Sequence, residues 1–124
     1  MPVILGVAVG GALGASARYA LDRVIEARSE SIFPWATFVI NLSGCFVIGV
    51  VTATIVDRPH VPAWLRIGLV MGVVGGYTTF STYAQEGLDL VDARDTAAAI
   101  AYIGGSVVLG IIAVYAGRSA GRAL

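Results

Sequence analysis

The chain is short, apolar and electrically neutral: of its 124 residues, 57% are hydrophobic and 13% are charged, with eight basic and eight acidic side chains. A soluble domain of this length has too little interior to bury so much apolar surface, which excludes a compact soluble enzyme. The apolar residues must therefore be grouped into segments that belong to a membrane.

Four long segments carry no charged side chain, at residues 1–17, 32–56, 67–85 and 96–117. Because a helix needs about 20 apolar residues to cross the core of a bilayer, they predict four transmembrane helices. We place these spans at about residues 2–21, 32–56, 67–86 and 96–117 of a single all-α unit covering residues 1–124. We expect an integral protein of the inner (plasma) membrane that is surrounded by lipid and has no nucleic-acid partner.

The first segment combines a stripe of small residues with an arginine. Gly6, Gly10 and Gly14 recur at intervals of four, a spacing that lets helix backbones approach closely in lipid. Arg18 follows, and it either draws anions to an entrance or extends to the lipid headgroups; the sequence leaves both readings open. A cleaved signal peptide is the alternative for this segment, but it lacks a basic start and three more spans follow it.

The second segment and the connection after it hold isolated side chains that could carry chemistry. Cys45 is the only cysteine and His60 the only histidine, which excludes a disulfide framework and argues against a zinc site. We expect Cys45 to pack as a small apolar residue between helices. Asn41 lies in the middle of the span, where its amide must find hydrogen-bond partners.

The third segment contains the sequence VGGYTTFSTY, residues 74–83, in which good helix formers are scarce. Gly75, Gly76, Thr78 and Thr79 have low helix propensity, so the helix either breaks in mid-membrane or kinks there with threonine hydroxyls filling the gap. A break would free backbone carbonyl oxygens, which suit a small hard cation. Two antiparallel copies meeting at this point would form an oxygen cage with carbonyls from each.

Polar and aromatic side chains form one row on the third span and another on the fourth. Phe80 and Tyr83 share a helix face, with Thr79 four residues before Tyr83. Tyr102 and Ser106 are also four residues apart and share a face of the fourth span. The two rows either face each other along a pathway or supply hydrogen bonds that hold the helices together.

The chemistry of the spans favours a small anion as the ion that passes. No Asp or Glu lies within the charge-free segments, and cation carriers generally need a carboxylate inside the membrane. The segments offer donors instead, among them the Asn41 amide and the hydroxyls of Ser81 and Thr82, together with the electropositive edges of aromatic rings.

The arginines give no preferred orientation in the membrane. The ends of the spans on the side of the termini carry Arg58, Arg66, Arg118 and Arg122, and the opposite ends carry Arg18, Arg23, Arg28 and Arg94. An equal division gives no bias under the positive-inside rule. Either the topology is weakly signalled, or the protein inserts both ways and forms an antiparallel homodimer about an axis in the membrane plane.

Three stretches, GGALGASARY, PWATFVINLSGCFVIG and GVVGGYTTFSTYAQE, resemble the Fluc/CrcB family of fluoride channels, and the resemblance covers essentially the whole chain. It implies a fluoride-selective channel that exports fluoride passively and relieves fluoride toxicity. It also implies four-helix subunits in an antiparallel dual-topology dimer, two pores lined by both subunits, and a structural sodium ion at the dimer centre.

The resemblance assigns roles to particular residues. The backbone carbonyls of Gly75 and Thr78 would hold the sodium ion at the break in the third helix, and Arg18 would lie in a vestibule. The pore asparagine falls on Asn41 and the pore aromatic pair on Phe80 and Tyr83. The residues expected along the fluoride path are Asn41, Thr79, Phe80, Ser81, Thr82, Tyr83, Tyr102 and Ser106.

The chain departs from the family pattern at two positions, Tyr83, where phenylalanine is usual, and Gly110, where the fourth helix usually carries another polar residue. The family also contains heterodimers of paralogous subunits, so both a homodimer and a heterodimer remain open. The other functions considered are a small dual-topology multidrug-type exporter, which would need a glutamate in the first span, and a non-transporting membrane assembly subunit. We expect no enzymatic activity, since no nucleophile and base can be assembled from these residues.

Overall fold

The computed structural model describes all residues from Met1 to Leu124 and is built from helices alone. The longest helices are α1 (Val3–Glu26), α2 (Trp35–Val51) and α6 (Thr96–Arg122). A π-helical stretch, η1 (Thr52–Val56), continues α2 without a gap. Between η1 and α6 lie α3 (Ala63–Ile67), the π-helical η2 (Gly68–Val74), α4 (Gly75–Tyr77) and α5 (Phe80–Asp92).

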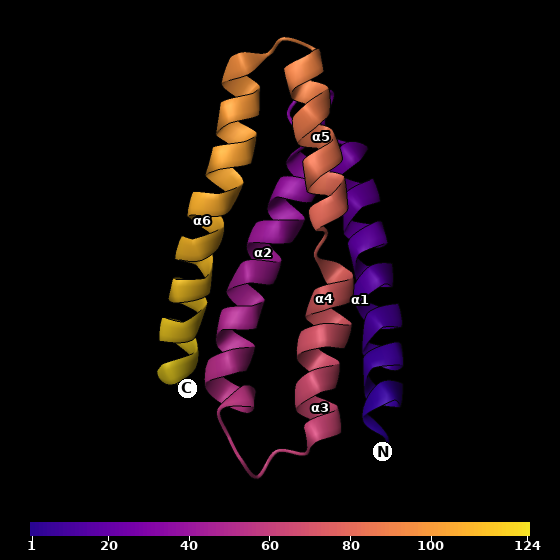
Figure 1. Cartoon of the computed structure of the whole chain (residues 1–124), viewed down its shortest axis with the longest axis vertical. Coiled ribbons are helices and arrows are strands. Elements are labelled where there is room, and N and C mark those ends of the chain that lie inside the picture. The colour runs from indigo at the N-terminus through magenta and orange to yellow at the C-terminus, as the bar shows by residue number, and fades with distance from the viewer.

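Figure 1 shows these elements as four roughly parallel columns: α1, the α3–α4 column with α5 above it, α2, and α6, with both termini at the same end. Three helices, Val3–Glu26, Trp35–Val56 and Thr96–Arg122, are long and apolar enough to cross a membrane by length and composition. The chain is therefore an all-α membrane protein. The segment predicted as the third span, residues 67–86, is divided among four shorter elements.

The helix ends differ from the predicted spans where charged residues and proline intervene. α1 extends to Glu26 and α6 to Arg122, both beyond the charge-free stretches. A membrane helix can continue beyond the hydrocarbon core into the headgroup region, where charged side chains are solvated. The second helix begins at Trp35 rather than at residue 32, since the residue before Pro34 is pushed away from helical backbone angles and Pro34 lacks an N–H.

The glycine stripe of α1 packs against a second stripe on the α3–α4 column, formed by Gly68, Gly72 and Gly76. An added Cβ on Gly10 would lie 2.5 Å from the Gly68 carbonyl oxygen, and one on Gly72 would lie 2.9 Å from the Val7 carbonyl oxygen. A Cβ on Gly14 would collide with the backbone of Val73. The backbones are thus in direct contact, as the four-residue spacing predicts.

A second close contact joins the α2–η1 helix to α6. An added Cβ on Gly49 would lie 2.8 Å from the Arg118 amide nitrogen, and one on Gly121 would lie 2.9 Å from the Ala53 Cβ. Nearer the middle of the pair, the Cys45 sulfur would lie 3.4 Å from a Cβ on Gly110. Cys45 is therefore a packing residue, as predicted. The bundle consists of two closely packed pairs, one built on α1 and one on α6.

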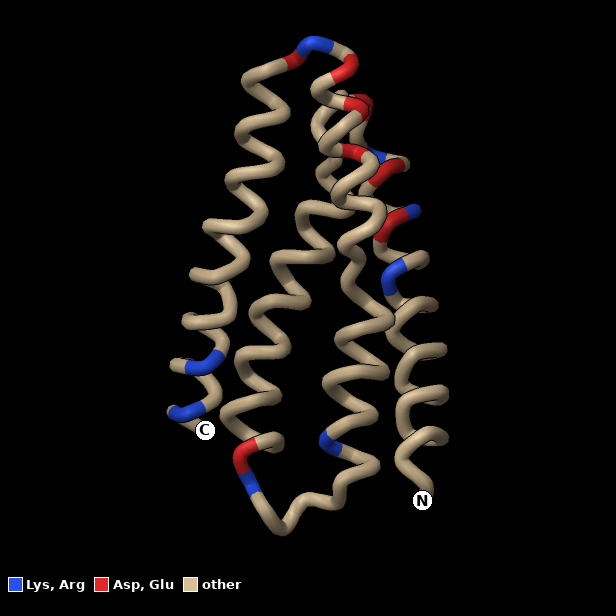
Figure 2. The backbone as a smooth tube through the Cα atoms, viewed as in Figure 1, with Lys and Arg blue, Asp and Glu red and all other residues tan.

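The charged residues are distributed unevenly between the two ends of the bundle. Of the eight acidic residues, all except Asp57 belong to the far end of α1, the connection after it, α5 and the α5–α6 connection. Figure 2 shows these acidic positions, in red, gathered along the backbone at the end opposite the termini. The arginines divide equally between the ends, so the end that carries the termini has an excess of positive charge.

The packing of α1 predicts a specific sensitivity at Gly14. Gly14→Ala should lower the stability of the detergent-purified protein by about 1–3 kcal/mol, because the new methyl group has no space beside the Val73 backbone. Gly104→Ala on α6 is the matched control, since no atom lies within 4 Å of its added Cβ and alanine favours a helix. Thermal unfolding measures both variants. Equal melting temperatures for the two would contradict the packing described for α1.

Candidate functional site

The helical column that starts at Ala63 is interrupted between Tyr77 and Phe80. Thr78 has φ −84° and ψ 160°, and Thr79 has φ −147° and ψ 117°, so both residues have extended backbone. Extended angles suit β-branched side chains, whose rotamers are restricted in a helix. The interruption leaves backbone groups that must find partners outside the helical pattern.

The Asn41 side chain from α2 supplies those partners for Thr79. Its amide nitrogen donates to the Thr79 carbonyl oxygen at 3.0 Å, and the Thr79 N–H donates to the Asn41 amide oxygen at 2.8 Å. One side chain thereby satisfies both backbone groups of an extended residue. This is the partner that a mid-helix asparagine in an apolar protein requires.

The side chains of the two threonines are also engaged locally. Thr78 donates its backbone N–H and its hydroxyl to the Val74 carbonyl, at 3.0 and 2.9 Å. The Thr79 hydroxyl caps α5 by accepting from the Thr82 N–H at 3.3 Å, and it donates to the Thr82 hydroxyl at 3.0 Å. Capping of this kind stabilises the start of α5 directly after the interruption.

Two carbonyl oxygens beside the interruption lose the donors that an unbroken helix would give them. The helical donor for Gly75 would be the N–H of Thr79, which goes to Asn41 instead. The helical donor for Thr78 would be the N–H of Thr82, which goes to the Thr79 hydroxyl. Neither oxygen has its helical donor, and carbonyl oxygens are ligands that suit hard cations.

Arg18 approaches the same interruption from α1. Its Nε donates to the Gly76 carbonyl oxygen at 3.3 Å, so the side chain turns toward the bundle. Together with Asp22, Thr79 and Thr82 it lines a cavity of about 260 Å³ between α1, α2 and α5. The guanidinium therefore contacts the α4 backbone directly before the interruption, a position that the sequence alone did not reveal.

Beyond the interruption, three aromatic rings form a row from α5 to α6. The ring centroids of Phe80 and Tyr83 are 5.7 Å apart, and those of Tyr83 and Tyr102 are 5.3 Å apart. Phe80 is 79% exposed at one end of the row, whereas Tyr102 is fully buried at the other. The predicted rows of the third and fourth spans thus meet at the Tyr83–Tyr102 contact.

The remaining predicted path residues behave differently from one another. The Ser106 hydroxyl, one turn after Tyr102 on α6, is buried and has no hydrogen-bond partner. Ser81 lies on the exposed side of α5 and makes no hydrogen bond, while the hydroxyl of Thr82 accepts from Thr79. Ser106 therefore has an unused donor inside the protein, whereas the Ser81 side chain is exposed.

Glu86 and Thr37 belong to this site although the sequence did not single them out. The Tyr102 hydroxyl donates to one Glu86 carboxylate oxygen at 2.6 Å, and the Thr37 hydroxyl donates to the other at 2.9 Å. Thr37 is 2% exposed and Tyr102 is fully buried, so the carboxylate joins α2, α5 and α6 through two buried hydroxyls. The one-turn spacing from Thr82 to Glu86 was the only sequence signal that placed Glu86 near this face.

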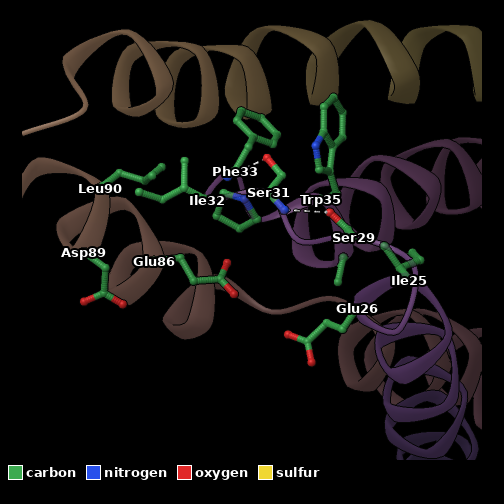
Figure 3. Close-up of a pocket in the computed structure, with 12 residues that line it drawn as sticks. Ile25, Glu26, Ser29, Ser31, Ile32, Phe33, Trp35, Glu86, Asp89 and Leu90 are labelled. Carbon is green, nitrogen blue, oxygen red and sulfur yellow. Dashed lines mark hydrogen bonds between the residues drawn. The ribbon is translucent and has the colours of Figure 1, made fainter. Parts of the chain in front are cut away.

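Glu86 also borders a cavity of about 470 Å³ at the acidic end of the bundle. Figure 3 shows the carboxylates of Glu86 and Glu26 on one side of this cavity, with Phe33 from the α1–α2 connection and Trp35 from the start of α2 on the other. The row of rings thus leads from the interruption towards an opening with acidic walls.

The sequence matches a family described as CrcB-like protein, Camphor Resistance (CrcB), over residues 5–118. A relative named fluoride-specific ion channel FluC from Acidobacterium capsulatum is 44% identical over 121 residues, which cover 95% of this chain and 94% of the relative. A relative of the same name from Chloroflexus aurantiacus is 41% identical over 119 residues, covering 96% and 94% of the two chains. One named fluoride-specific ion channel FluC 2, from Clostridium acetobutylicum, is 37% identical over 112 residues, covering 90% and 92%.

The pairing between Asn41 and Thr79 predicts that Asn41→Ala destabilises the interruption. Two backbone groups would lose their partners in an apolar setting, at about 1–3 kcal/mol for each. Ser43→Ala on the same helix is the control, because it removes hydroxyl bonds to Ile40 and Tyr77 but none to the extended residues. Thermal unfolding and hydrogen exchange at residues 78–82 measure the effect. A loss no greater than that of Ser43→Ala would show that Asn41 does not hold the interruption.

Proposed function

We propose that this chain, which belongs to the CrcB family, is a fluoride-specific ion channel and carries out no enzymatic reaction. The channel lets fluoride leave the cell down its gradient and so relieves fluoride toxicity, from a position in the inner (plasma) membrane. The observation that carries the proposal is the similarity to fluoride channels over nearly the full length of the chain. The chemistry of the site also suits an anion, because the site offers hydrogen-bond donors and the electropositive edges of aromatic rings.

The path for fluoride runs along the α5–α6 face. Fluoride is small and strongly hydrated, so protein donors must replace the water it loses. The Ser106 hydroxyl is buried and unpartnered, a condition that is unfavourable unless the group receives a ligand. The edges of Phe80 and Tyr83 carry partial positive charge, and the two ring centroids lie 5.7 Å apart at the start of α5, directly after the interruption held by Asn41.

The functional unit is an antiparallel dual-topology dimer in which the interruption of the third helix lies at mid-membrane depth. The equal division of the arginines supports insertion in both orientations. An antiparallel pair also places the acid-rich end of one subunit beside the end of the other that has an excess of positive charge, on each membrane face. The exposed Phe80 supports the dimer, because a second subunit would cover its ring. A homodimer satisfies these conditions, and a heterodimer with a paralogous subunit satisfies them equally well.

A sodium ion at the dimer centre completes the proposed assembly. Its ligands are the carbonyl oxygens of Gly75 and Thr78 from each subunit, which have lost their helical donors. The ion supplies positive charge that holds two interruptions together in an apolar setting where free carbonyls are unfavourable. Arg18 is close to the same backbone, where it donates to the neighbouring Gly76 carbonyl.

Fluoride efflux from proteoliposomes tests the function. Vesicles loaded with potassium fluoride and containing this chain alone should release fluoride faster than empty vesicles. Phe80→Ile should slow the release about tenfold or more, since an aliphatic side chain lacks the electropositive ring edge. Phe46→Ile on α2 is the matched control, because Phe46 is outside the row of rings. Absence of flux from the purified chain would reject the homomeric channel, and unchanged flux in Phe80→Ile would remove Phe80 from the path.

Removal of sodium tests the ion site separately. Replacing all sodium by N-methylglucamine on both sides of the vesicles should slow fluoride efflux and reduce the dimer fraction on a sizing column. The carbonyl cage is too small for this cation, so the two interruptions would repel each other. Lithium and potassium serve as comparisons of different ionic size. Full activity and an intact dimer without sodium would refute the proposed site.

A further inference from the structure

Tyr83 makes a hydrogen bond that connects two helices at the centre of the row of rings. Its hydroxyl donates to the backbone carbonyl oxygen of Ile103, in the interior of α6, at 2.8 Å. A helical carbonyl already accepts one backbone N–H, but its second lone pair can accept another donor. The phenol therefore attaches α5 to α6 at a point where the two helices also pack.

The contact extends one turn along the same faces. Gly87 follows Tyr83 by four residues on α5 and is buried, and a Cβ placed on it would lie 3.1 Å from the Ile103 side chain. Ile103 thus receives the Tyr83 hydroxyl with its carbonyl and packs against Gly87 with its side chain. The two helices are fixed in both distance and rotation at this level.

The hydrogen bond decides what Tyr83 can offer to an anion. Because its only hydroxyl proton points to Ile103, the phenol oxygen presents lone pairs elsewhere, and these repel an anion. The ring itself is held between Phe80 and Tyr102, at centroid distances of 5.7 and 5.3 Å. Tyr83 therefore gives the path a ring edge in a fixed orientation and no additional donor.

We propose that Tyr83 is a positioning residue whose bond to the Ile103 carbonyl clamps α5 to α6 and fixes the ring orientation in the fluoride path. The inference rests on the proposed fluoride conduction. The clamp holds the electropositive edge of the ring in one orientation, so the edge cannot follow an ion that moves along the row. The rate at which fluoride passes is then set by the clamp, whereas the affinity for fluoride is set by other groups.

Tyr83→Phe removes the clamp and keeps the ring. We expect the maximal rate of fluoride efflux to rise about two- to tenfold, the factor that one net hydrogen bond is worth. The fluoride concentration that gives half-maximal flux should stay the same, because no donor to fluoride is lost. Tyr115→Phe on α6 is the matched control, since Tyr115 is 73% exposed and is outside the row of rings.

Two results would overturn the proposal. An unchanged maximal rate would mean that the bond does not limit ring motion. A slower efflux with a raised half-maximal concentration would mean that the Tyr83 hydroxyl itself donates to fluoride.

Hydrogen exchange in the absence of fluoride tests the clamp independently of flux. Residues 84–92 and 103–110 should exchange faster in Tyr83→Phe than in the parent protein, and Tyr115→Phe should not change them. If neither the parent protein nor the two variants carry fluoride, the proposed function fails. The exchange rates then still decide whether the clamp exists. Unchanged exchange in Tyr83→Phe would reject it.

Discussion

The pairing of the Asn41 side-chain amide with both backbone groups of one residue, Thr79, is the interaction on which the rest of this site depends. Asn41 satisfies both the N–H and the carbonyl of Thr79, and so permits extended backbone inside an apolar bundle. Because Thr79 is extended, its hydroxyl is available to cap α5, and the ring of Phe80 starts a new helix with its own rotation. The same change of direction releases the carbonyls of Gly75 and Thr78 from their helical donors.

Much of the fold follows from features that act along a single helix. The charge-free stretches predicted three helices that are long and apolar enough to cross a membrane. The glycine spacing predicted close approach between helices, and Gly10 and Gly72 do meet at their backbones. Proline explains why the second helix begins at Trp35. The low helix propensity of residues 75–79 indicated where irregular backbone was to be expected.

The pairings between helices could not be predicted in the same way, because they depend on rotations that a single sequence does not reveal. The sequence indicated that Asn41 needs a hydrogen-bond partner, but only the folded structure shows that this partner is the Thr79 backbone. Arg18 was expected at an entrance or at the headgroups, and it donates to the Gly76 carbonyl. Glu86 was missed because it follows the last uncharged residue of its segment, whereas its carboxylate reaches back to Thr37 and Tyr102.

The interruption also divides the third column between two neighbours. Below it, η2 and α4 pack on α1 through backbone contacts, such as that of Gly76 with Gly11, 2.8 Å from an added Cβ to the carbonyl oxygen. Above it, α5 is attached to α6 through Tyr83 and Gly87 and to α2 through Glu86. The bundle is therefore two interlocked bodies that share one column. Any movement of one body relative to the other must be absorbed by the backbone torsions of Thr78 and Thr79, the joint to which Asn41 is bound.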